Sequence, residues 1–165
     1  PAESWVHTAD EGGGRVLGEV CHFVDLARYF IGAPIVSVQA NAASVSGGGC
    51  DDLNVALRFG DGSLASIVYT GLGDSVYSKE LIEAYAGGSV VTVDNFQSCT
   101  IAEHGKLSKP RKQTQDKGFK VALQEFASAV ISGGAAPIDE AELIETSLAT
   151  IAIMESLREG RRIDL

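Results

Sequence analysis

The sequence has 165 residues, enough for one domain with a core of its own. Hydrophobic residues make up 45% and charged residues 21%, a composition that is typical of a globular domain and excludes disorder. No apolar run reaches the roughly 18 residues of a membrane span, and a net charge of −9 opposes binding to nucleic-acid phosphates. We therefore expect a single domain over residues 1–165, with neither a membrane segment nor a nucleic-acid partner.

Three cysteines, Cys21, Cys50 and Cys99, stand at wide spacing without a Cys-x-x-Cys pair. This odd number predicts reduced thiols in a cytoplasmic protein and argues against a disulfide framework or a zinc site. The chain begins at Pro1 without a Met or a signal segment. We therefore expect it to be a piece of a longer polypeptide.

The first predicted element is a helix over residues 16–31. The segment is apolar on most sides, and Gly32 follows it, with Pro34 just beyond. Glycine takes the left-handed conformation that ends a helix, and proline cannot continue one.

Residues 35–104 change to the alternating pattern of β-strands. Two pairs, Asp61-Gly62 and Gly87-Gly88, predict tight hairpin turns. A glycine-rich stretch, 46–51, is expected to be a loop. Strands are predicted at 35–45, 53–59, 64–70, 79–86, 89–94 and 97–104.

A run of basic side chains follows the strands. It predicts a solvated loop, with an anion or partner site as the alternative. Its members are Lys106, Lys109, Arg111, Lys112, Lys117 and Lys120.

Two more helices are predicted after this run. Apolar residues recur at helical spacing over 119–130, and Gly133 ends that segment. The last helix begins at Asp139, with Glu142 three residues on as in a capping box, and runs to Gly160.

Strands grouped between terminal helices predict the α+β class. We expect a two-layer sandwich, in which helices cover one face of an open, mostly antiparallel or mixed sheet of about six or more strands. The strand 64–70 is apolar on both sides, with Leu64 and Val68 opposite Ala65, Ile67 and Tyr69. An uncovered apolar face commonly marks an association surface. We therefore expect a homodimer or tetramer formed face to face through the sheet, with covering loops as the alternative.

The segment Gly71-Leu72-Gly73, with Asp94 further on, imitates a dinucleotide-binding fingerprint. Val76 stands where the third glycine belongs, and the intervening residues predict the hairpin around Gly87-Gly88. The sequence thus predicts no dinucleotide-binding loop in this chain.

The pair of residues best suited to proton transfer is His22 with Asp25, three apart on the first helix. Histidine titrates near neutrality, and a neighbouring carboxylate can orient it. A packed histidine hydrogen-bonded to Asp25 is the alternative. His7 and His104 show no spacing typical of metal ligands, so no metal site is expected.

The stretch 12–32 resembles the segment that opens the C-terminal domain of the glucose-fructose oxidoreductase / inositol dehydrogenase / MocA family. The family motif is a glycine-rich turn, then Asp-x-Gly-x-His-x-x-Asp and an apolar helix ending in glycine. The resemblance continues through 51–59, the Gly87-Gly88 turn, and Ile138-Asp139 with the helix that follows. It implies a fold like the C-terminal domain of glyceraldehyde-3-phosphate dehydrogenase. It also implies an upstream Rossmann domain that holds NAD or NADP, with no cofactor bound by this chain alone.

The resemblance implies oxidation of a sugar or polyol hydroxyl, with His22 as the catalytic residue for proton transfer. Arg15, Glu19 and Asp25 are the expected substrate-binding residues. The sequence departs from the motif at Gly18, where the family has its first Asp, and at Val20, where the family has glycine. Glu19 is a possible replacement for that Asp. Because Gly18 has no side chain, a non-catalytic oligomerisation module of the same origin is the alternative function.

Overall fold

The structure is a computed structural model, and it describes residues 14–43, 52–109 and 114–165. The predicted loop 46–51, the end of the predicted strand 35–45, and Arg111 and Lys112 lie outside these ranges. The chain divides into two compact units. Unit 1 comprises Pro1–Leu72 and Ile138–Leu165, and unit 2 comprises Gly73–Pro137.

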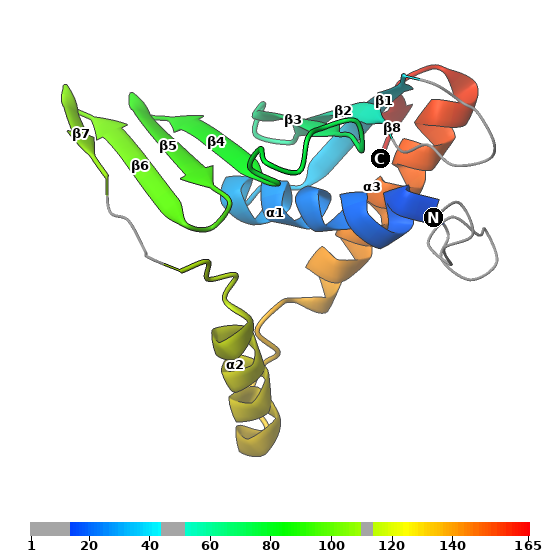
Figure 1. Cartoon of the computed structure of the whole chain (residues 1–165). Coiled ribbons are helices and arrows are strands. Elements are labelled where there is room, and N and C mark those ends of the chain that lie inside the picture. Colours follow the sequence, from blue (N-terminus) through cyan, green and yellow to red (C-terminus); the bar gives the residue numbers. More distant parts are fainter. Residues whose placement is uncertain (1–13, 44–51, 110–113) are drawn as a thin grey trace. The chain divides into compact units, whose positions relative to one another are not determined.

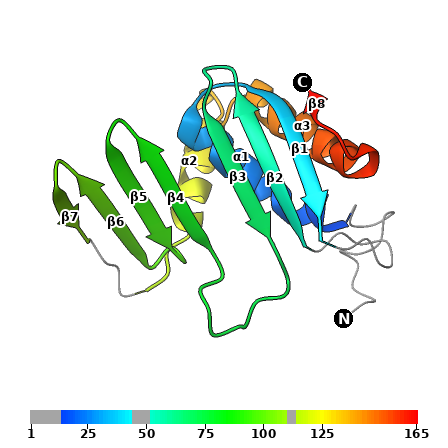
Figure 2. The ribbon, with the colours of Figure 1, turned by 90° about the horizontal axis from the view of Figure 1, so that it is seen from above.

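Unit 1 contains a four-stranded antiparallel sheet in the order β3-β2-β1-β8. Its helices cover one face of that sheet (Figure 1), and Figure 2 shows the strands from the opposite side. Its strands are β1 (Ile35–Ala42), β2 (Leu53–Phe59), β3 (Leu64–Tyr69) and β8 (Ile163–Asp164). Its helical elements are the π-helix η2 (Val16–Val20), α1 (Cys21–Ile31) and α3 (Glu140–Glu159).

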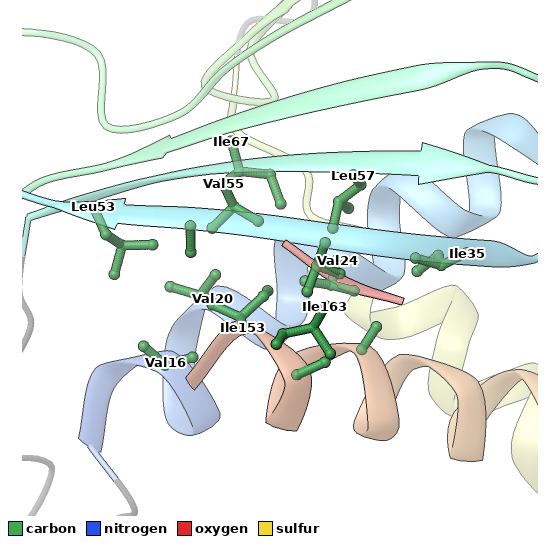
Figure 3. Close-up of a cluster of buried hydrophobic side chains, with 14 of the residues drawn as sticks. Val16, Val20, Val24, Ile35, Leu53, Val55, Leu57, Ile67, Ile153 and Ile163 are labelled. Atoms are coloured by element: carbon green, nitrogen blue, oxygen red, sulfur yellow. The ribbon is translucent and has the colours of Figure 1, made fainter. Parts of the chain in front are cut away.

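The core of unit 1 lies between the helices and the sheet (Figure 3). Alternate residues of β2, from Leu53 to Phe59, face inward and are at most 4% exposed, whereas the intervening residues face outward. This is the alternation expected of a sheet with one covered face. From the helices, Val20, Val24 and Ile153 complete the core with no exposed surface.

The two faces of β1 differ from the prediction near its start. The sequence puts Val36 on the same side as Val38 and Ala40, but Ser37 is buried and Val36 is only half-buried. The register shifts between Ile35 and Ser37, as in a β-bulge. The extra residue reverses the alternation at that point.

The end of α3 is fixed to the sheet through a buried hydroxyl. The backbone N–H of Ala40 donates to Ser156 Oγ at 2.9 Å, and that hydroxyl donates to the Arg161 carbonyl at 2.6 Å. Gly160, with φ of 65°, ends the helix between them. The start of α3 is capped by Asp139, whose carboxylate accepts from Ala141 N as predicted.

Unit 2 contains a second antiparallel sheet in the order β4-β5-β6-β7, and the helix α2 (Phe119–Ser132). The predicted hairpin is confirmed, since Gly87 and Gly88 both have the positive φ values, 57° and 81°, that such a turn requires. The strands are β4 (Leu81–Ala86), β5 (Ser89–Asp94), β6 (Ser98–Glu103) and β7 (Lys106–Ser108).

The α+β class and the antiparallel pairing are confirmed, and the six predicted strands, together with two more, form two sheets of four. Residues 70–80 make turns and bends without a strand, so the ladder does not continue from β3 to β4. Two strands were not predicted. β8 has two residues and β7 three, too few to show alternation, and β7 falls in the basic run. In the part of the chain described, no helix is both long and apolar enough to cross a membrane.

Candidate functional site

The segment before His22 is a π-helix. The N–H of Cys21 donates to the carbonyl of Val16, five residues back, so Gly18 and Glu19 lie within a widened turn. Such turns are rare and occur often at functional sites. The sequence predicts a helix here but gives no sign of its wider winding.

The helix pair η2 and α1 has one buried and one exposed side. Val16, Val20 and Val24 are buried against the core, whereas Gly18 and His22 are exposed. No hydrogen bond joins His22 to Asp25, although both residues are described. The structure thus differs from the alternative of a packed His22 hydrogen-bonded to Asp25, since His22 is exposed.

The other three predicted site residues are half-buried and sit around this turn. Arg15 Nη1 donates to the Tyr69 hydroxyl of β3 at 3.0 Å. The Tyr69 ring in turn packs on Phe23, with 6.3 Å between ring centroids. These contacts tie the start of the helix to the sheet.

Asp25 faces α3, where its Oδ1 lies 3.5 Å from the Thr146 hydroxyl. At the end of α1, Arg28 Nε donates to Glu145 at 3.1 Å, and Glu145 also accepts from the Ile35 N–H. Both contacts join residues that are more than a hundred positions apart. The carboxylate expected to orient His22 instead contributes to the packing of α1 on α3.

Residues Tyr69, Thr146 and Glu145 were not found from the sequence. Each contacts the first helix from a distant strand or helix, and a single sequence carries no pairing signal between such positions.

The thiol of Cys21 lies beside this site, and burial raises its pKa above that of a free cysteine, with the carboxylates of Glu19 and Asp25 adding to the rise. A raised pKa keeps the thiol protonated and unreactive at neutral pH. We expect alkylation of Cys21 to be slower than that of free cysteine, with a pH profile displaced to higher pH. Peptide mapping after iodoacetamide treatment at several pH values measures this. A pH profile equal to that of free cysteine, or displaced to lower pH, would contradict the expectation.

The segment after Gly71 leads into the β4–β5 hairpin and not into a helix, so no helix N-terminus follows those glycines to hold a pyrophosphate. Within the described ranges, no three His, Cys, Asp or Glu side chains cluster as metal ligands do.

Residues 1–84 match the family model described as the GFO/IDH/MocA C-terminal domain. No curated protein matches the chain. An aldose-aldose oxidoreductase from Caulobacter crescentus, solved with glycerol, has the same fold with a TM-score of 0.85 at 20% identity. The match covers 100% of this chain and 52% of that one.

Two other solved structures share the fold. An oxidoreductase from Agrobacterium radiobacter, in complex with NAD+, L-tartaric acid and magnesium, matches 90% of this chain and 48% of its own at 17% identity and a TM-score of 0.74. A UDP-N-acetylglucosamine 3-dehydrogenase from Acidithiobacillus ferrooxidans matches 87% of this chain and 47% of its own at 13% identity and a TM-score of 0.74. The chain thus spans about half the length of these structures.

Proposed function

The chain belongs to the GFO/IDH/MocA family through its C-terminal domain, and from that premise we propose that it is the substrate-binding domain of a cytoplasmic, NAD(P)-dependent sugar or polyol dehydrogenase. An N-terminal Rossmann domain in the same polypeptide would hold the cofactor. The observation that carries the proposal is the family match, which includes the helix with His22. Two of the solved structures with this fold are an aldose-aldose oxidoreductase and a UDP-N-acetylglucosamine 3-dehydrogenase.

The proposed role of His22 is to take the proton of the substrate hydroxyl. Its imidazole lies on the exposed side of the helix, where a substrate has access. The glycine at position 18 leaves space one helical turn before it. Glu19 and Arg15 are half-buried near this position, and Asp25, which faces Thr146 of α3, is the third proposed substrate-binding residue. Hydrogen bonds to sugar hydroxyls are the chemistry that such side chains supply.

Gly18 supports the second candidate, a non-catalytic oligomerisation module. Without the family's first Asp, the exposed imidazole has no carboxylate one turn earlier. The two candidates are separated by assaying the full-length protein with NAD and NADP against a panel of aldoses, inositols and sugar acids. Reduction of the cofactor by any panel member supports the dehydrogenase, and none by the whole panel favours the module.

We expect this chain alone to bind neither NAD nor NADP, because the described segment after Gly71 and Gly73 leads into strands and not into a helix whose N-terminus could hold a pyrophosphate. Titration calorimetry with each nucleotide should give no heat of specific binding. A dissociation constant near micromolar would contradict the expectation that residues 71–94 form no dinucleotide-binding loop.

The proposed dimer forms through the outer face of the unit 1 sheet. On β3, Leu64 and Val68 are 74% and 75% exposed, whereas Ile67 faces the core and is 8% exposed. The exposed fractions of Leu64 and Val68 show that no described loop covers these two side chains. The exposed residues of the neighbouring strand β2 are Asn54, Ala56 and Arg58, so the large apolar side chains that would be buried in a two-fold symmetric contact are those of β3.

We therefore expect Val68→Asp to convert the dimer to a single chain without unfolding it, because a carboxylate would be buried unpaired in the contact. Light scattering at micromolar concentration measures the mass, and circular dichroism checks the fold. Leu72→Asp is the matched control, since Leu72 is 82% exposed but lies beyond β3. If the unsubstituted protein had the mass of a single chain, the proposed dimer would be contradicted.

A further inference from the structure

The helix α2 carries an apolar stripe without a partner. Phe119, Leu123, Phe126 and Val130 recur at the spacing that places them on one side of a helix. They are 72%, 71%, 61% and 66% exposed. Left-handed glycines, Gly118 and Gly133, bound the helix at its two ends.

Unit 2 also lacks a core of its own. No described residue between Gly73 and Pro137 is buried, whereas every buried apolar side chain lies in unit 1. A unit of this size needs apolar burial to be stable. The stripe on α2 supplies large side chains for such burial, so another surface must cover it.

We propose that α2 docks, through this stripe, on the N-terminal half of the same polypeptide. This inference rests on the part of the proposed function that places such a half before residue 1. The match to the Caulobacter enzyme covers all of this chain, α2 included, and only 52% of that enzyme. The shared fold, therefore, belongs to proteins that have about as much chain again with which to cover α2.

A second copy of the chain is the less suitable occupant. The outer face of β3, in unit 1, is already the proposed surface for pairing, with Leu64 and Val68 exposed on it. A stripe of two phenylalanines with leucine and valine is also typical of a permanent contact, because permanent interfaces are more hydrophobic than transient ones.

The test is site-specific photocrosslinking in the full-length protein. Phe126→p-benzoylphenylalanine keeps the phenyl ring and adds a reactive group, and the same change at Phe119 provides a second position should one variant fold poorly. Val121, on the opposite side of α2 and 59% exposed, is the matched control position. Irradiated protein is digested, and the crosslinked peptides are identified by mass spectrometry.

We expect Phe126 and Phe119 to crosslink to peptides that precede residue 1 within one polypeptide, and position 121 to do so several-fold less. Crosslinks only within residues 1–165, crosslinks to a second polypeptide, or equal yields from both sides of α2 would overturn the inference. The yield does not depend on turnover. A protein that crosslinks as expected but oxidises no substrate therefore contradicts the proposed function alone.

Discussion

Replacing His22 with asparagine in the full-length protein is expected to lower turnover by roughly 10²- to 10⁴-fold, the usual scale for losing a general acid or base. Asparagine keeps polarity and most of the volume but cannot take a proton. Because His22 is exposed and makes no hydrogen bond to the core residues around it, the substitution should leave the fold intact.

The measurement is kcat and KM with the best substrate of the panel, with thermal unfolding as the check on folding. The control is Tyr29→Phe, since Tyr29 lies at the far end of the same helix and is 80% exposed. That change should leave turnover within a few-fold of the parent. If His22→Asn did the same, His22 would have no catalytic role and another group would take the hydroxyl proton.

The largest expected loss of stability follows from Phe59→Ala. Phe59 is 1% exposed at the end of β2, in the core between the sheet and the helices. Removing a buried phenyl ring costs about 3–5 kcal/mol, through the lost transfer free energy and the cavity that remains. We expect the free energy of unfolding to fall by that amount.

Urea unfolding of the 165-residue chain, followed by circular dichroism, measures the change. Leu72→Ala is the matched control, because Leu72 lies beyond β3, is 82% exposed, and its truncation should cost less than about 0.5 kcal/mol. Equal losses for the two variants would contradict the placement of Phe59 in the core.

Most elements could be predicted because their signals are local. Alternation and the Asp61-Gly62 turn predict β2 and β3, and Gly32 and Gly160 mark the ends of α1 and α3. The β-bulge near Ser37 could not be predicted, since its extra residue is defined by pairing with β2. The shorter strands β7 and β8 likewise depend on the strands beside them.

The candidate site was only partly predictable for the same reason. The spacing of His22 and Asp25 suggests a pair, but Asp25 contacts Thr146 of α3 instead. That contact depends on how two helices pack, which no local pattern encodes. The hydrogen bond from Arg15 to Tyr69 joins positions 54 residues apart, so local patterns in the sequence could not predict it either.

In the proposed function, this chain presents a hydroxyl-bearing substrate to a nicotinamide cofactor held by the rest of the polypeptide. Its most direct test uses the full-length protein and a substrate deuterated at the carbon that carries the reacting hydroxyl. The account predicts that the deuterium appears in the reduced cofactor, because the carbon–hydrogen bond breaks with transfer of a hydride while the hydroxyl proton leaves separately. Product formation without deuterium in the cofactor, or no oxidation of any panel member, would contradict it.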